Sequence, residues 1–169
     1  HPIAGGEMSG SRLSSDTLFD GAQCILTPTG KTDPESLKRA IELWKTIGMQ
    51  VSIMDPKEHD FIFGAVSHLP HVLIFALMNT LGGLKSENYD RITSFSGSGL
   101  RDITRIAASE PAMWRDICVS NKDFILYFLD QFQETLNHLR SGIEQENGTL
   151  LTQQFEIANQ HRLNLVSKT

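Results

Sequence analysis

Two short apolar runs on either side of one amphipathic helix constrain the fold of this chain more than any other feature. Residues 23–27 (QCILT) end at Pro28, and residues 50–54 (QVSIM) follow Gly48; both runs predict buried strands. Between them, Asp33, Pro34 and Glu35 predict a helix start, because a capping residue, a proline and an acid suit the first turn. The buried stripe of this helix is expected to be Leu37, Ala40, Ile41, Trp44 and Ile47.

This β-α-β unit is too small to form a stable sheet by itself. Parallel strands are normally covered on both faces and flanked by further strands. We therefore expect the unit to be the edge of a larger sheet whose other strands precede residue 1. No G-x-G-x-x-G motif follows any strand in the chain, so a nucleotide site is expected upstream as well.

From residue 55 to the end the pattern is helical. Residues 57–82 predict one long or two abutting helices, with Pro70 forcing a kink or break. Residues 86–98 predict an irregular segment with one helical turn near residues 89–93. The fold class is therefore mainly α: residues 1–55 would form a β-α-β remnant with an active-site loop, and residues 56–169 a helical domain.

The longest predicted element is a single helix over residues 111–146. Its apolar side chains recur every three or four residues: Ile125, Phe128, Phe132, Leu136, Leu139 and Ile143. A helix of this length would extend roughly 50 Å, more than one small domain can cover. We expect part of its apolar face to contact a second subunit. Residues 149–166 predict a last amphipathic helix.

Composition excludes several classes of protein. The 169 residues carry a net charge of −5, so there is no basic stripe for nucleic acid. Two distant cysteines offer neither a disulfide framework nor metal-ligand spacing. Together with the absence of a signal-peptide pattern in the first twenty residues, this predicts a cytoplasmic protein.

One uncharged stretch, residues 61–84, is long enough to span a membrane. His68, Pro70 and His71 lie in its middle, however, and Gly82 and Gly83 interrupt its end. A buried helix in a protein without a membrane partner is the better interpretation.

Residues 97–108 predict a short helix with a distinctive polar face. Gly97 and Gly99 are expected to open it, where a sharp turn or a close approach to a ligand needs a residue without Cβ. Arg101 and Arg105 lie one turn apart, an arrangement that suits a ligand carboxylate. A solvated basic face is the alternative.

Three stretches carry a family resemblance. The first is residues 99–107 (GLRDITRIA), followed by residues 113–117 (MWRDI) and Asn121. The others are residues 1–5 (HPIAG) and the pair His59-Asp60 leading to residues 67–71 (SHLPH). Together they resemble the signature of prephenate and arogenate dehydrogenases. One departure is GSGL at residues 97–100, where that family usually has three glycines and a phenylalanine.

The resemblance implies roles for individual residues. His1 would accept a hydrogen bond from the ring hydroxyl of the substrate and take up its proton, chemistry that suits a neutral imidazole. Arg105 would bind the ring carboxylate through its two parallel donors. His71 would line the substrate pocket, Glu7 would lie at its mouth and pair with a cation, and Gly99 belongs to the loop that contacts the substrate.

For several other residues the sequence leaves more than one interpretation open. Trp114 would close the pocket from a neighbouring subunit or belong to the core. His68 and His71 are three residues apart, but no third ligand is evident, so hydrogen-bonded core histidines are favoured over a metal site. His59-Asp60 is expected to cap a helix start, and Arg101 to form a salt bridge with Asp102 or Glu110.

The resemblance also implies an activity and partners. The chain would be part of a homodimeric enzyme that oxidatively decarboxylates prephenate, or arogenate, in tyrosine biosynthesis. NAD or NADP would be bound mainly by an amino-terminal Rossmann domain that this chain lacks, and no metal would take part. The rival interpretation is a non-catalytic helical interaction module. Retention of His1, His71 and Arg105 favours the enzyme.

Overall fold

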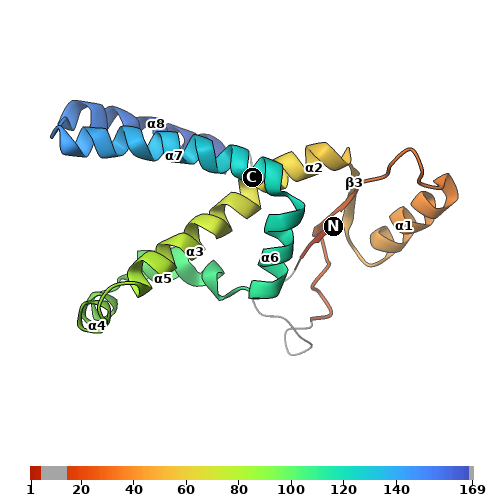
Figure 1. Ribbon diagram of the computed structural model, residues 1–169. Coiled ribbons are helices and arrows are strands. Elements are labelled where there is room, and N and C mark those ends of the chain that lie inside the picture. Colours follow the sequence, from red (N-terminus) through yellow and green to blue (C-terminus); the bar gives the residue numbers. More distant parts are fainter. Residues whose placement is uncertain (5–14, 168–169) are drawn as a thin grey trace. The chain divides into compact units, whose positions relative to one another are not determined.

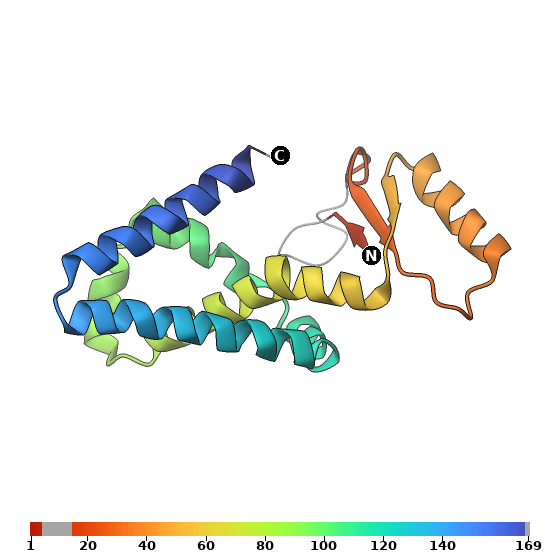
Figure 2. The same cartoon turned by 90° about the horizontal axis from the view of Figure 1, so that it is seen from above.

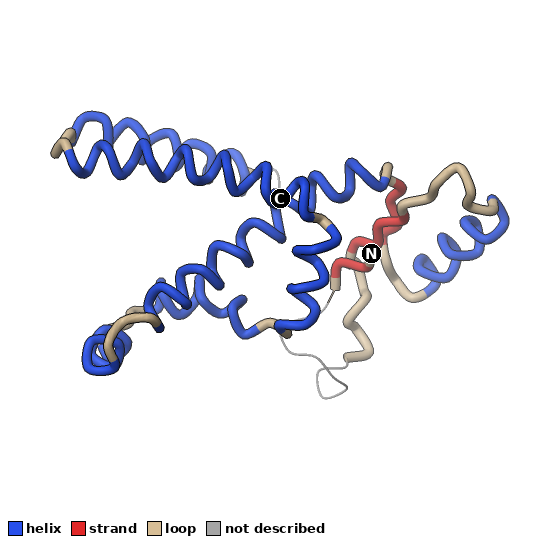
Figure 3. Tube along the Cα trace, viewed as in Figure 1, coloured by secondary structure: helices blue, strands red, loops and turns tan. Residues whose placement is uncertain are grey.

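The computed structural model describes residues 1–4 and 15–167 (Figure 1). The chain divides into two compact units, residues 1–125 and residues 126–169. All strands of the described chain lie before residue 54, and the rest is helical (Figure 3). The expected fold class, mainly α with a small sheet first, is confirmed.

The sheet has three strands in the order β1-β2-β3. Strands β2 (Gln23–Leu26) and β3 (Gln50–Ile53) pair in parallel, with Cys24 opposite Val51, as the β-α-β pattern predicts. The sequence pattern missed β1 (Pro2–Ile3), which pairs antiparallel with β2. Two residues are too few to show a strand period, and only pairing with β2 makes this segment a strand.

Helix α1 (Pro34–Thr46) begins as expected. The Asp33 carboxylate accepts a hydrogen bond from the backbone N–H of Ser36 at 2.8 Å. Hydrogen bonds from Ser36, from its side chain first and then its backbone, hold the pKa of Asp33 below its ordinary value. The chain then turns at Gly48, whose φ is +92°. A Cβ there would lie 3.3 Å from the Cα of Asp20, so this turn needs glycine.

The predicted helix over residues 57–82 forms with a local widening rather than a break. Helix α2 (Pro56–Phe63) runs through a π-helical segment, η2 (Gly64–His68), into α3 (Leu69–Gly82). Pro70 has no N–H, and its ring crowds the carbonyl four residues earlier; a wider turn just before it relieves both. By length and composition alone, this continuous helix could cross a membrane. Of its most apolar 18-residue segment, 11% is buried in the structure.

Residues 86–98 differ from expectation. They contain a helix, α4 (Ser86–Ser94), in place of an irregular segment with a single turn. Its partly buried face includes Tyr89 and Thr93, and the Thr93 hydroxyl donates to the Tyr89 carbonyl at 3.0 Å. So narrow a face does not produce a recognisable apolar stripe in the sequence.

Helix α5 (Ser98–Thr104) follows, and a 3-10 turn, η3 (Arg105–Ala108), continues it and packs against α3. The conformational reason given for Gly97 is wrong. Its φ of −77° with ψ of 177° is extended backbone that any residue adopts. Apart from the chain neighbours and the backbone of the same helix, no described atom lies within 4 Å of a Cβ built on Gly97 or Gly99, so the described fold requires neither glycine.

The predicted single helix over residues 111–146 is also wrong. The chain forms α6 (Pro111–Ser120) and α7 (Lys122–Glu144), separated at Asn121. Asn121 is 7% exposed, and its side chain bonds to groups on α2 and η2. The spacing of apolar residues along the sequence does not reveal this corner, because one non-helical residue between two helices leaves that spacing almost unchanged.

Helix α8 (Gly148–Val166) matches the last predicted helix and forms a hairpin with α7. The two helices are tightly packed at the turn, where a Cβ on Gly142 would lie 2.7 Å from a methyl of Leu150. Away from the turn they diverge (Figure 2). The opening leaves an apolar groove of about 320 Å³ whose lining includes Leu136, Leu139, Ile143, Leu151 and Phe155.

Candidate active site

A cleft of about 390 Å³ lies within the first unit. His1, just before β1, borders one side of it, α2 and η2 form a second, and α6 with the α6–α7 corner forms the third. The lining consists of His1, His59, Asp60, Ser67, His68, Met113, Trp114, Ile117, Ser120 and Asn121. Three imidazoles and a carboxylate therefore line one cleft.

His1 is held at the sheet edge by its backbone. Its nitrogen donates to the carbonyl of Ile25 at 2.8 Å, and the Ile25 N–H donates back to the carbonyl of His1 at 2.9 Å. The imidazole packs on the ring of Phe63, with 4.6 Å between ring centroids. The backbone pairing with β2 thus places the side chain of His1 against α2.

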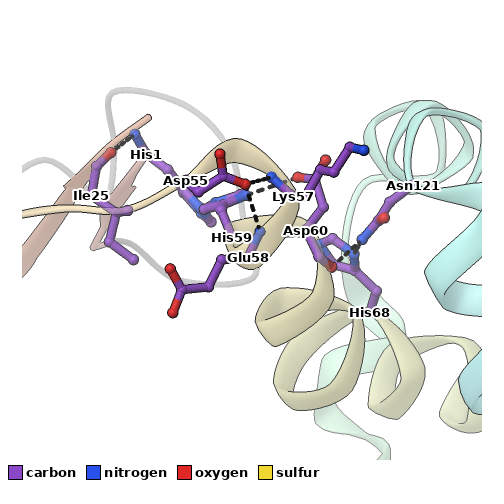
Figure 4. A network of polar contacts seen from close by, with 9 residues as sticks. All are labelled: His1, Ile25, Asp55, Lys57, Glu58, His59, Asp60, His68 and Asn121. Atoms are coloured by element: carbon purple, nitrogen blue, oxygen red, sulfur yellow. Dashed lines mark hydrogen bonds and ion pairs between the residues drawn. The ribbon is translucent and has the colours of Figure 1, made fainter. Parts of the chain in front are cut away.

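A chain of hydrogen bonds runs from His1 into α2 (Figure 4 shows the residues). His1 Nδ1 lies 2.7 Å from Nε2 of His59, and His59 Nδ1 lies 2.9 Å from Oδ1 of Asp60. The helix-capping role expected for His59-Asp60 is wrong, because Asp55 caps α2. The Asp55 carboxylate accepts from the N–H of Lys57 at 2.8 Å.

His68 and Asn121 form a second polar pair on the cleft. The Asn121 amide donates to the carbonyl of Asp60 at 2.7 Å and to Nδ1 of His68 at 2.9 Å. His68 Nδ1 is then an acceptor, so the neutral ring carries its proton on Nε2. Burial lowers the pKa of His68, the nearby His59 and His71 lower it further, and Asp60 opposes them.

This lowered pKa predicts that the folded protein loses stability in mild acid. Below the ordinary value of 6.5, the unfolded chain protonates His68 while the folded chain resists protonation. The free energy of unfolding should therefore fall as the pH falls from about 7 to about 5. His68→Gln removes this titration, so its thermal midpoint should change less over that range. His161→Gln, at an exposed position on α8, is the control and should retain the wild-type slope; an unchanged slope in His68→Gln contradicts the assignment.

Trp114 lines the cleft and is 7% exposed. The ring of His71 stacks on it at 3.7 Å between centroids, and Nδ1 of His71 donates to the carbonyl of Ser67 at 2.8 Å. Nε1 of Trp114 is buried and has no hydrogen-bond partner among the described residues. A buried indole N–H normally has an acceptor, so this unpaired donor is an exception among the described residues.

The described residues 1–4 and 15–167 hold no group of three His, Cys, Asp or Glu side chains arranged for a metal ion. The imidazoles that line the cleft bond to one another, to Asp60 or to Asn121 instead. The chemistry that this arrangement supports is proton transfer and hydrogen bonding to a polar ligand.

Comparison with known families identifies the chain. The family described as "Prephenate dehydrogenase, dimerization domain" matches residues 55–157. The one described as "Prephenate dehydrogenase, nucleotide-binding domain" matches residues 1–53. The chain belongs to the prephenate dehydrogenase family. The resemblance seen in the sequence motifs is thereby confirmed.

Individual relatives agree with this assignment. Prephenate dehydrogenase of Bacillus subtilis is 39% identical over 96% of this chain and 43% of its own length. The Aquifex aeolicus prephenate dehydrogenase in complex with hydroxyphenyl propionate and NAD+ has a TM-score of 0.86 and 41% identity, over 98% of this chain and 57% of that one. Synechocystis arogenate dehydrogenase has a TM-score of 0.79 and 26% identity, over 98% and 60%. The chain spans about half the length of the curated relatives it matches.

The structure brings together some of the predicted site residues of this family member. His1 and Trp114 line one cleft, and His71 stacks against Trp114. Arg105 begins η3 and Gly99 lies in α5, and neither is among the residues that line the cleft. Glu7 lies outside the described residues.

Arg101 differs from its predicted pairing. Its Nη1 donates to the carbonyl of Ser96 at 3.0 Å, and within the described part of the chain it forms no ion pair with Asp102 or Glu110. Sequence reasoning also missed His59, Asp60 and Asn121 as site residues. All three belong to the motifs that resemble the family, and this is the only feature of the sequence that marks them as site residues. Their spacing along the chain gives no sign that they converge with His1.

Proposed function

We propose that this chain is the carboxy-terminal part of an NAD- or NADP-dependent prephenate dehydrogenase, a cytoplasmic enzyme of tyrosine biosynthesis. The observation that carries the proposal is the position of His1 at a cleft that Trp114 and His68 also line, with His71 stacked on Trp114. Membership of the family and the 41% identity to a prephenate dehydrogenase complexed with hydroxyphenyl propionate and NAD+ support it.

The reaction would be oxidative decarboxylation to 4-hydroxyphenylpyruvate. His1 removes the proton of the ring hydroxyl while the hydride on the same carbon passes to the nicotinamide, which is the chemistry the cofactor supplies. The ring carboxylate then departs as carbon dioxide, and its bonding electrons make the ring aromatic. Arg105 would hold that carboxylate before it leaves.

Among the described residues, the helix starts that follow the parallel strands do not fit the pyrophosphate of the cofactor. Helices α1 and α2 each follow a strand of the parallel pair, and their first turns are capped by the carboxylates of Asp33 and Asp55. A negative side chain at the helix N-terminus opposes a bound phosphate. Binding of the pyrophosphate is therefore assigned to the part of the longer relatives that this chain does not span, which would hold most of the cofactor.

A spectrophotometric assay of the complete protein tests the function. Reduced nicotinamide and 4-hydroxyphenylpyruvate should appear together with prephenate as substrate. Arogenate is the second candidate substrate, supported by the structural likeness to the Synechocystis arogenate dehydrogenase, and would give tyrosine directly. A folded protein that oxidises neither compound with NAD or NADP would favour the non-catalytic helical module.

The protein is also proposed to be a homodimer. The α7–α8 hairpin leaves its apolar groove open, and the continuous helix Pro56–Gly82 is largely unburied in the single chain. Phe155, in the groove, is 55% exposed. A second copy of the chain is the occupant that the matched dimerization domain favours.

Sedimentation at micromolar concentration should give a species of two chains, and a clean 18.9 kDa monomer from this chain contradicts the proposal. Phe155→Glu should weaken association by about tenfold or more, because each buried aromatic side chain contributes about 1.5–3 kcal/mol. Glu156→Gln, on the adjacent exposed position, is the control and should leave association unchanged.

A further inference from the structure

We infer that His59 is a positioning residue that fixes the protonation pattern of His1, and that Asp60 fixes that of His59 in turn. This inference rests on the proposed function, because it gives His1 the role of proton acceptor. It concerns the hydrogen bonds that join His1 to His59 and His59 to Asp60. The helix-capping role predicted for His59-Asp60 does not include them.

The pattern starts at Asp60. A carboxylate has only acceptor atoms, so the hydrogen bond of 2.9 Å to Oδ1 places a proton on Nδ1 of His59. A neutral imidazole carries one proton, so Nε2 of His59 is left as an acceptor. The side chain of His59 is 16% exposed and that of Asp60 is 48% exposed.

The pattern then passes to His1. Its Nδ1 lies 2.7 Å from the bare Nε2 of His59, so Nδ1 of His1 must carry the proton and donate. Nε2 of His1 is thereby left with a free lone pair. This is the state that a proton acceptor for the substrate hydroxyl requires. Without His59, both neutral tautomers of His1 would be populated.

Packing against Phe63 holds the imidazoles of His1 and His59 in this hydrogen-bonded arrangement. The ring of Phe63 lies 4.6 Å from both imidazoles, and the two imidazoles meet edge to face at 5.0 Å. When His1 takes up a proton on Nε2, its bond to His59 becomes charge-assisted, and Asp60 stabilises the positive charge from the far end. A triad in which a carboxylate orients a histidine follows the same logic.

His68 also faces this chain of hydrogen bonds but does not belong to it. Its Nδ1 accepts from Asn121, and its electrostatic partners include His59, Asp60 and His71. Lys57 and Glu58, on the same helix as His59, are exposed. Among the charged groups of the described residues, Asp60 is the one that bonds His59.

Variants of His59 in the complete enzyme test the inference. His59→Leu should lower kcat by about ten- to a hundredfold, less than the loss of a general base itself, with KM within about threefold. His59→Gln should recover part of that loss, because its carbonyl oxygen can still accept from Nδ1 of His1. The acidic limb of the pH profile should move to lower pH in His59→Leu, because a proton on His1 loses its support. Glu58→Gln is the control on the same helix and should match the wild type.

Asp60→Asn tests the far end of the chain of hydrogen bonds. An amide that donates to Nδ1 of His59 reverses the direction of both hydrogen bonds and puts the proton of His1 on Nε2. We expect a fall in kcat of about tenfold or more, with KM nearly unchanged. Wild-type kcat in a folded Asp60→Asn protein would overturn the role of Asp60.

Nitrogen NMR of the imidazole rings provides a readout that does not depend on activity. In the wild type, His1 should show a protonated Nδ1 and a bare Nε2, and in His59→Leu a mixture. Equal spectra for the two proteins, or full activity in His59→Leu, would overturn the inference. If instead His1→Asn retains kcat, the proposed role of His1 fails first, and the two failures are distinguishable.

Discussion

His1→Asn in the complete enzyme should lower kcat by about 10²- to 10⁴-fold, the range by which a positioned general base accelerates a reaction. Asparagine can still donate to Nε2 of His59 from its amide, so it preserves the 2.7 Å contact that Nδ1 makes. It has no counterpart of Nε2, the nitrogen that would receive the hydroxyl proton. Because proton removal belongs to the chemical step, KM should change little.

The measurement is steady-state kinetics with saturating cofactor, beside a thermal melt that verifies folding. Leu is a harsher substitution than Asn at this position, since it would also leave His59 Nε2 without its donor. A folded His1→Asn enzyme with kcat within about threefold of wild type would mean that another group on the cleft, such as His59 or His68, accepts the proton.

Arg105→Ala should raise KM by about ten- to a hundredfold with kcat nearly unchanged. Hydrogen bonds to charged groups contribute about 1.5–3 kcal/mol, and a contact made equally in the ground and transition states affects binding alone. Arg105 begins η3, which packs against α3, the helix that carries His71. Arg105→Lys retains the charge without the two parallel donors, so it should recover only part of the affinity.

Arg101→Ala is the matched comparison, one turn earlier in the chain. The guanidinium of Arg101 donates to the carbonyl of Ser96, so its loss should leave KM within about twofold. The reverse result, with a large effect at Arg101 and none at Arg105 in folded proteins, would place the carboxylate on Arg101.

Local patterns determined most of the secondary structure. Asp33 and Pro34 signal the start of α1, short apolar runs predict both parallel strands, and the order strand-helix-strand predicts their pairing. These features depend on residues near one another in the chain, which is why sequence alone predicts them. The short motifs around His1, His71 and Arg105 were also sufficient to indicate the family, because each motif is a run of neighbouring residues.

Tertiary contacts decided what those patterns missed. Strand β1 exists because its backbone bonds to β2, and the corner at Asn121 is tied by its side chain to Asp60 and His68, more than fifty residues away. The same holds for the candidate site. The sequence predicts that His59 helps to cap a helix start. Only the pairing of β1 with β2 brings His1 to within hydrogen-bond distance of His59. Sequence patterns determined which side chains this protein has available for proton transfer, whereas the folded backbone decided which of them touch, because hydrogen bonds depend on distance in space and not along the chain.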